Sequence, residues 1–166
     1  MPARKSLIVV SLIGLLGLAG LLAWTGRHPG PVPALQFTLL DGSRIDLAAL
    51  RGRPVLVTFW SLSCPPCLEE VPELRRAHEA LGPRGLEIIA VAMTYDPPTA
   101  VLDYATRENL PYRVAFDLDG NIARAFGGVA QLPRSIVIGP DGAVAASLLG
   151  KVGFEGLKDA VQQFLH

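Results

Sequence analysis

The chain of 166 residues carries 15 basic and 15 acidic side chains, so its formal net charge at neutral pH is zero. This balance gives no electrostatic reason to expect nucleic acid as a partner, because nucleic-acid-binding domains are typically basic. Half of the residues are hydrophobic, and residues 35–166 are enough for one domain with its own core, which we expect to be a monomer.

The N-terminal segment is expected to cross a membrane. Residues 7–24 contain no charged side chain, and as a helix they would extend about 27 Å, close to the hydrocarbon thickness of a bilayer. Arg4 and Lys5 precede them, and the positive-inside bias places residues 1–6 in the cytoplasm. Residues 25–34 are rich in Pro and Gly and predict an extended linker, so residues 35–166 would lie in the periplasm, tethered to the inner membrane.

Two other interpretations of residues 7–24 compete with an uncleaved anchor. A cleaved signal peptide needs small residues at its cleavage site, and the best candidate, Ala23-Trp24-Thr25, has a bulky Trp24 in the middle. A lipoprotein signal needs Cys after Leu18-Ala19-Gly20, where this chain has Leu21. We therefore expect an uncleaved anchor, with a cleaved signal and a buried core helix as alternatives.

The exported domain begins with strands. Residues 35–40 and 43–47 flank Asp41-Gly42, which is typical of a two-residue hairpin turn. A short helical turn over residues 48–51 follows, and the apolar, β-branched run over residues 54–60 predicts a central strand buried on both faces.

Helices and strands then alternate. We expect helices over residues 65–81, 98–109 and 121–126 and strands over residues 86–93 and 113–117. A second hairpin, residues 135–139 and 143–149 around Pro140-Asp141-Gly142, and an amphipathic helix over residues 154–165 complete the chain. This order predicts an α/β fold with right-handed βαβ units, to which the last hairpin adds antiparallel strands.

Both cysteines lie in Cys64-Pro65-Pro66-Cys67, between a buried strand and a helix. A disulfide that closes so small a ring removes little loop entropy and is a poor structural staple. A zinc site would need a second pair of ligands, and His28, His78 and His166 do not provide one. We therefore predict a redox-active Cys64–Cys67 disulfide, with no metal and no other cofactor.

The position of the motif predicts its chemistry. Cys64 is at the N-terminus of a helix, which favours its thiolate, so it should attack substrate disulfides and Cys67 should resolve the mixed disulfide. Pro65 and Pro66 have no N–H and remove two potential donors to the Cys64 sulfur. A hydrogen bond to a charged group is worth about 1.5–3 kcal/mol. Losing one raises the thiolate pKa by about one to two units and makes the pair more reducing, so we predict a reductant.

Three segments resemble a known family: VLVTFW at residues 55–60, CPPCLEEVP at residues 64–72, and QLPRSIVI at residues 131–138 followed by Pro140-Asp141-Gly142. Over residues 35–166 the chain resembles the thioredoxin superfamily, in particular the TlpA/ResA-like membrane-anchored thioredoxins. The resemblance implies a thioredoxin fold: a mixed β-sheet flanked by helices, with an N-terminal β-hairpin and an extra central βα unit, preceded by one transmembrane helix.

The resemblance also implies roles for single residues. Pro133 would be the cis-proline that faces the cysteines, and the backbone of Leu132 would pair with a bound substrate chain. Together with Pro65 and Pro66 they form the expected substrate-binding surface. Pro72 would be the kink proline of the active-site helix.

Glu70 matches the acidic residue that these anchored thioredoxins carry three positions after the second cysteine. Its direction on the helix lies near that of Cys67, so a carboxylate there is placed to relay the proton of Cys67. The alternative is a solvated glutamate in the first turn, stabilised by the helix dipole. Two departures from related proteins are Ser63, where many thioredoxins have Trp, and Thr58, where cytosolic thioredoxins have an acid. The second would leave proton handling mainly to Glu70.

The resemblance implies a reductase that takes electrons from a transmembrane thiol reductase and passes them to disulfides of exported proteins, often an apocytochrome c. An oxidase or isomerase of secreted proteins is the main alternative. A peroxiredoxin-like peroxidase is a second alternative, because Ser61 fits the Thr or Ser of the peroxidatic motif. That motif also needs Pro where this chain has Val57.

Overall fold

The computed structural model describes residue 32 and residues 34–166. The expected cytoplasmic residues 1–6, the expected anchor over residues 7–24 and most of the linker over residues 25–34 lie outside the described residues. Within the described part, no helix is long and apolar enough to cross a bilayer.

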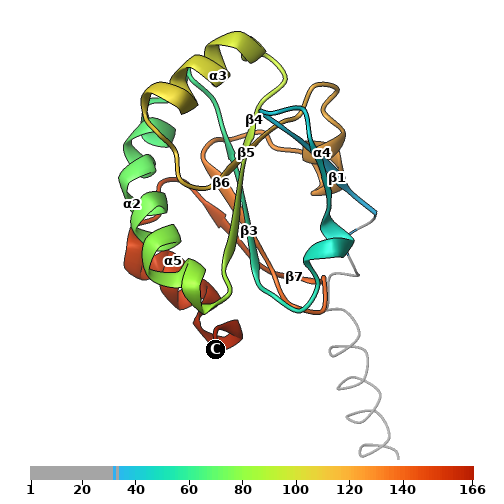
Figure 1. The fold of residues 1–166 in the computed structure, drawn as a ribbon, viewed down its shortest axis with the longest axis vertical. Helices are drawn as coiled ribbons and strands as arrows, with labels where there is room; N and C mark the ends of the chain where they lie inside the picture. Colours follow the sequence, from blue (N-terminus) through green and yellow to red (C-terminus); the bar gives the residue numbers. More distant parts are fainter. Residues whose placement is uncertain (1–31, 33) are drawn as a thin grey trace, which may run out of the picture. The chain divides into compact units, whose positions relative to one another are not determined.

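A seven-stranded mixed sheet forms the centre of the domain (Figure 1). Its strands, in spatial order, are β2 (Arg44–Asp46), β1 (Gln36–Leu39), β5 (Arg113–Phe116), β4 (Glu87–Ala92), β3 (Val55–Trp60), β6 (Arg134–Ile138) and β7 (Val144–Leu149). Strands β3, β4 and β5 are parallel, whereas β1 is antiparallel to β5 and β6 is antiparallel to β3. This arrangement confirms the predicted thioredoxin fold, including the N-terminal hairpin and the extra central βα unit.

Helices cover both faces of the sheet. On one face lie α2 (Pro65–Leu81), α3 (Pro98–Arg107) and α5 (Phe154–Val161), and on the other lie α4 (Asn121–Ala125) and the short 3-10 helix η1 (Leu47–Leu50) (Figure 1). Successive side chains of β3 point to opposite faces, so Leu56 and Trp60 belong to the core under the first group and Val57 and Phe59 to the core under the second. All of β3 is buried, as its continuous apolar run predicts.

The turn of the first hairpin is longer than the two residues that the sequence predicts. The N–H of Leu39 donates to the carbonyl of Ser43 at 2.8 Å, and that of Gly42 donates to the carbonyl of Leu39 at 3.0 Å. Residues 40–42 therefore form a three-residue connection, with Gly42 in the left-handed region at φ +80°. Gly142, also at φ +80°, occupies the same place in the turn between β6 and β7.

Three α-helices end earlier than their patterns predict, α4 by a single residue. Helix α3 stops at Arg107, and Asn109 has left-handed backbone at φ +47°, which no α-helix continues through. The last helix ends at Val161 and continues as the 3-10 turn η3 (Gln162–Phe164). A further 3-10 turn, η2 (Gly82–Arg84), follows α2, whose predicted bounds are confirmed.

One edge of the sheet collects the loops that carry the sequence motifs. The carboxyl ends of the parallel strands meet there, because Trp60 pairs with Ala92 and Ala92 pairs with Phe116. Strand β6 starts at the same edge, with Arg134 opposite Phe59. The loop that leads to Cys64 is thus flanked by the loop after β4 on one side and by the Pro133 loop on the other.

Candidate active site

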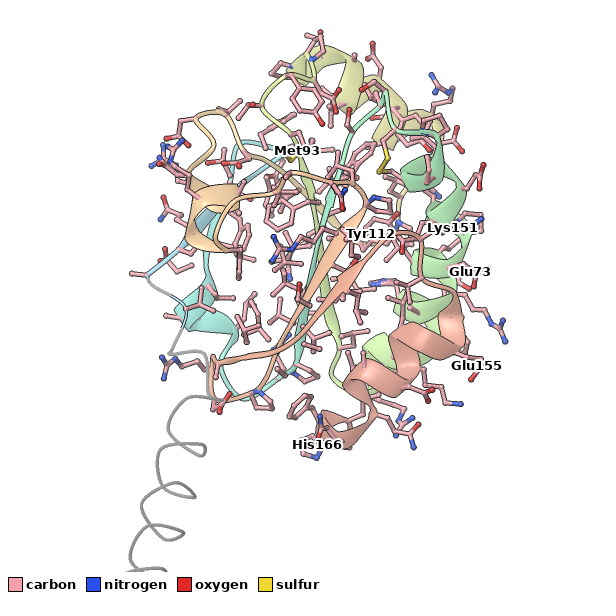
Figure 2. All side chains as sticks on the ribbon, turned by 180° about the vertical axis from the view of Figure 1, so that it is seen from behind. Glu73, Met93, Tyr112, Lys151, Glu155 and His166 are labelled. Atoms are coloured by element: carbon pink, nitrogen blue, oxygen red, sulfur yellow. A yellow bond between two sulfur atoms is a disulfide. The ribbon has the colours of Figure 1, made fainter. Side chains whose placement is uncertain are left out.

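A disulfide joins Cys64 and Cys67 at the start of α2, with a sulfur–sulfur distance of 2.07 Å. Figure 2 shows this bond in yellow on the first turn of the helix. Cys64 is the N-cap residue and is partly exposed, whereas Cys67 is buried. The geometry agrees with the expected division of labour, in which a substrate reaches Cys64 first.

The first turn of α2 offers few donors to the Cys64 sulfur. Pro65 and Pro66 occupy the first two positions of the helix, and neither has an N–H. The backbone N–H of Cys67 does point at the sulfur, with its nitrogen 3.3 Å from Cys64 Sγ. One backbone donor therefore remains, which the sequence argument about the two prolines did not include.

Glu70 lies on the same helix and is buried, with 1% of its surface exposed. Its Oε1 accepts the backbone N–H of Val152 at 2.8 Å. Burial raises the pKa of Glu70 to about 7, although the Val152 N–H and the charge of Lys151 oppose that rise. The alternative of a solvated first-turn glutamate is therefore wrong.

Glu70 and Cys67 line one small cavity beneath the disulfide. Thr58, Trp60 and Tyr112 also line it, and none of the described residues around it except Glu70 carries a carboxyl group. The indole Nε1 of Trp60 is buried and has no hydrogen-bond partner in the described part of the chain. The cavity thus places an ionisable group, whose pKa is about 7, beside Cys67.

Tyr112 and Trp60 were not identified as site residues from the sequence. Tyr112 precedes β5, and it reaches the cavity only because β5 pairs with β4 and β4 with β3. Nothing in the local pattern around residue 112 specifies that pairing. Trp60 ends the predicted central strand, and the alternation of side chains along that strand places it on the α2 face.

Asp96, in the loop between β4 and α3, holds the turn that leads to Cys64. Its Oδ1 accepts from the Ser61 hydroxyl at 2.9 Å, and its Oδ2 accepts from the Leu62 N–H at 2.9 Å. Sequence reasoning missed this residue, because an aspartate just before a Pro-initiated helix is typical of any helix start.

The Leu132–Pro133 peptide bond is cis, as the resemblance implies. Pro133 is buried, and its carbonyl accepts the N–H of Gly150 at 2.8 Å. The antiparallel pairing of Arg134 with Phe59 brings the Pro133 loop to the edge of the sheet where Cys64 lies.

Three glutamates of α2 bind the connection between β7 and α5. Lys151 Nζ donates to Glu69 at 2.8 Å, the Val152 N–H to Glu70 at 2.8 Å, and the Phe154 N–H to Glu73 at 2.9 Å. Figure 2 shows Lys151 and Glu73 close together where α2 meets the start of α5. The segment that binds Pro133 through Gly150 therefore also binds the active-site helix.

No cluster of three or more His, Cys, Asp or Glu side chains that could hold a metal ion occurs among the described residues.

Comparisons with known proteins agree with this geometry. Residues 30–147 match the model of the AhpC/TSA family. The chain is 31% identical over 133 residues to the thiol-disulfide oxidoreductase ResA of Bacillus thuringiensis subsp. konkukian, covering 80% of this chain and 73% of that protein. It is also 31% identical over 119 residues to ResA of Bacillus subtilis, covering 70% of this chain and 65% of that one.

The domain also resembles a solved structure of a protein of this class. The domain superposes on a thiol:disulfide interchange protein of the thioredoxin family from Chlorobium tepidum with a TM-score of 0.75 and 25% identity, covering 83% of this chain and 97% of that one. The disulfide at the start of α2 and these similarities lead to one assignment. The chain belongs to the AhpC/TSA family of thioredoxin-fold proteins and is a thiol-disulfide oxidoreductase of the ResA type.

Proposed function

We propose that the chain is a membrane-anchored, periplasmic reductant of disulfides in exported proteins. The observation that carries this proposal is the paucity of donors around Cys64: two prolines at the start of α2 leave the Cys67 N–H, 3.3 Å from the sulfur. Fewer donors stabilise the thiolate less, and a less stable dithiol form gives up its electrons more readily. An oxidase of secreted proteins instead needs a stable dithiol form, so that its disulfide accepts electrons readily.

The proposed reaction is a thiol–disulfide exchange, in which electrons and protons are conserved. The Cys64 thiolate attacks one sulfur of the substrate disulfide, that bond breaks, and the other substrate sulfur leaves as a thiolate. Cys67 then attacks Cys64, which releases the second substrate thiolate and forms the Cys64–Cys67 disulfide. The Glu70 carboxylate takes the proton that Cys67 loses, for which a pKa of about 7 is suited at neutral pH.

Exposed apolar side chains at the edge of the sheet that carries Cys64 support a polypeptide as the substrate. Tyr95, Leu118 and Leu149 are each at least 60% exposed. Tyr95 and Leu118 follow β4 and β5, and Leu149 pairs with Arg134 next to Pro133, so all three lie at the edge that carries Cys64. The backbone of Leu132 makes no hydrogen bond with any other described residue, which leaves it available to a substrate chain.

The anchor expected over residues 7–24 would hold the enzyme beside a transmembrane thiol reductase, which would reduce the Cys64–Cys67 disulfide again. Residues 25–34 would serve as the linker. An apocytochrome c, which must present reduced cysteines to haem, is one exported substrate of this class.

The hydroxyl of Ser61 argues against the peroxidase alternative. It donates to the Asp96 carboxylate at 2.9 Å, so its proton is committed away from Cys64. A peroxide bound at Cys64 would therefore lack that donor.

Trapping tests the proposal directly. A full-length Cys67→Ser variant, expressed in a bacterial envelope, should accumulate mixed disulfides between Cys64 and exported proteins, including apocytochrome c if that is a substrate. The Cys64→Ser variant is the control and should trap none. Equilibration of the purified wild-type protein with a thiol couple should give a potential well below about −120 mV, the value of the strong periplasmic oxidant. A value near that figure would instead assign the protein as an oxidase.

A further inference from the structure

The turn that leads to Cys64 is held both by packing and by hydrogen bonds: Ser61 is fully buried, and Leu62 and Cys64 pack against the core. Ser63 is exposed, and Ser61 and Leu62 complete a short turn between β3 and α2. The carbonyl of Ser61 accepts the N–H of Cys64 at 3.2 Å, so the position of Ser61 bears directly on the reactive cysteine. Whatever holds Ser61 therefore also holds Cys64.

Asp96 is the side chain that holds this turn from outside it. It is 8% exposed and uses both carboxylate oxygens on the turn, one for the Ser61 hydroxyl and one for the Leu62 N–H. Its own backbone is fixed, since the Asp96 N–H donates to the carbonyl of Met93 at 3.1 Å and α3 begins two residues later. Asp96 thus joins the active-site turn to the ends of β4 and α3.

The direction of the hydrogen bonds follows from the donors present. A carboxylate accepts only, so the single hydroxyl proton of Ser61 goes to Asp96. The hydroxyl of Ser63, whose oxygen is 2.9 Å from that of Ser61, must then donate to Ser61, as does the Ser63 N–H at 3.1 Å. Every polar group of the turn that faces Asp96 is satisfied, and Ser63 is held as well.

We propose that Asp96 is a positioning residue of the oxidoreductase, which sets the place of Cys64 through its hydrogen bonds to Ser61 and Leu62. Leu62 and Cys64 of this turn pack against the core, but the small side chains of Ser61 and Ser63 bury little apolar surface, so packing alone does not fix the position of these two serines. Hydrogen bonds to a charged, buried acceptor are among the stronger ones and take over that task. This inference rests on the proposed role of Cys64 as the attacking thiol.

Asp117 provides a matched control elsewhere in the fold. It is 1% exposed, follows β5, and its two carboxylate oxygens accept the N–H groups of Ile122 and Ala123, each at 2.9 Å. Asp117 therefore holds the start of α4 with both carboxylate oxygens, just as Asp96 holds the active-site turn. Removing it should lower stability without changing Cys64.

The experiment compares four full-length proteins in detergent: wild type, Asp96→Ala, Asp96→Asn and Asp117→Ala. Two quantities are measured on each: the rate of reduction of a small aromatic disulfide, and the rate of alkylation of Cys64 as a function of pH, read by mass spectrometry. Thermal unfolding of each protein reports any general loss of stability. Asparagine keeps the bonds in modified form, because its carbonyl accepts from Leu62 and its amide donates to Ser61.

Asp96→Ala should slow disulfide reduction about tenfold or more, as expected when a reacting group loses its alignment. It should also shift the pH profile of Cys64 alkylation, and Asp96→Asn should restore most of the rate. Asp117→Ala should leave both readouts at the wild-type level even where its unfolding temperature falls as much as that of Asp96→Ala.

Wild-type values for Asp96→Ala would overturn the inference, as would equal losses in the Asp96 and Asp117 variants. An Asp96→Asn variant as slow as Asp96→Ala would also contradict it, because hydrogen bonds would then not be the cause. Failure of the wild-type protein to show a reactive Cys64 would instead overturn the proposed function, so the two failures are distinguishable.

Discussion

Glu70 Oε1 accepts the backbone N–H of Val152 at 2.8 Å, across 82 positions of the chain. This bond fixes the connection between β7 and α5 against the helix that carries the cysteines. It is also one of the few interactions that favour the charged form of a carboxyl group that burial pushes toward neutrality. The charge of Glu70 should therefore affect both stability and proton transfer.

Replacing Glu70 by Gln should stabilise the fold at high pH. The pKa of Glu70 rises from 4.5 to about 7 on folding, so between these values the native state binds more protons than the unfolded state. Stability from this group is complete below pH 4.5 and is lost as pH rises through about 7. The loss amounts to about 3 kcal/mol. A glutamine side chain cannot ionise, so the variant should gain about that much over wild type between about pH 4 and pH 8.

Urea unfolding of the oxidised full-length protein in detergent at several pH values measures this difference. Glu69→Gln is the matched control, because Glu69 is the exposed neighbour on the same helix. A difference between Glu70→Gln and wild type that stays constant across the pH range would show that the buried carboxyl does not titrate as described.

Replacing Pro66 by Ala should make the protein more oxidising. The change restores an N–H at the second position of α2, within reach of the Cys64 sulfur. One hydrogen bond to a thiolate is worth about 1.5–3 kcal/mol, which corresponds to a rise in potential of about 30–60 mV. Equilibration with a glutathione or dithiothreitol couple gives the value. Pro72→Ala, which also restores a backbone N–H but inside the helix, should leave the potential unchanged; an equal shift in both variants would contradict the argument.

Glu73→Ala should destabilise the domain by about 1 kcal/mol, the usual value of a helix cap. Helix α5 begins after Gly153, which has no side chain to cap it, and Glu73 accepts the N–H of Phe154 instead. Thermal unfolding measures the loss. Glu155→Ala, which removes an exposed acid from α5, should lower stability by less than half as much. Equal shifts in unfolding temperature would mean that Glu73 does not act as the cap.

The exposed apolar side chains at the edge of the sheet that carries Cys64 should affect the reduction of protein substrates only. Leu118→Ser removes an exposed leucine of that edge, and Leu102→Ser removes an exposed leucine of α3. Burying one leucine against a substrate is worth about 1.5 kcal/mol or more, so kcat/KM for a protein disulfide should fall about tenfold in the first variant and little in the second. Both should reduce a small aromatic disulfide at the wild-type rate. A parallel loss on the small disulfide would show that Leu118 supports the fold and not the substrate.

Residues that act within one element could be predicted from the sequence. The helix over residues 65–81, the buried strand over residues 54–60 and the Cys64–Cys67 pair follow from local periodicity and from spacing, and the structure agrees to within a residue. The cis bond before Pro133 came from the family resemblance and is present.

Residues that act between elements could not be predicted. Asp96 and Tyr112 reach the site because β3, β4 and β5 are neighbours in the sheet, a long-range pairing that no local pattern specifies. The burial of Glu70 likewise depends on a segment 82 positions away. The two-residue hairpin turn was wrong for a local reason, since Asp-Gly also fits the last two places of a three-residue turn.

The most direct test of the enzyme described here is the pH dependence of alkylation of the reduced protein, with mass spectrometry to show which cysteine reacts. We predict that Cys64 reacts first, and that its rate is half-maximal clearly below about pH 8.5, where an unperturbed thiol titrates. Prior reaction of Cys67, or a Cys64 no more reactive than a thiol in a free peptide, would contradict the account.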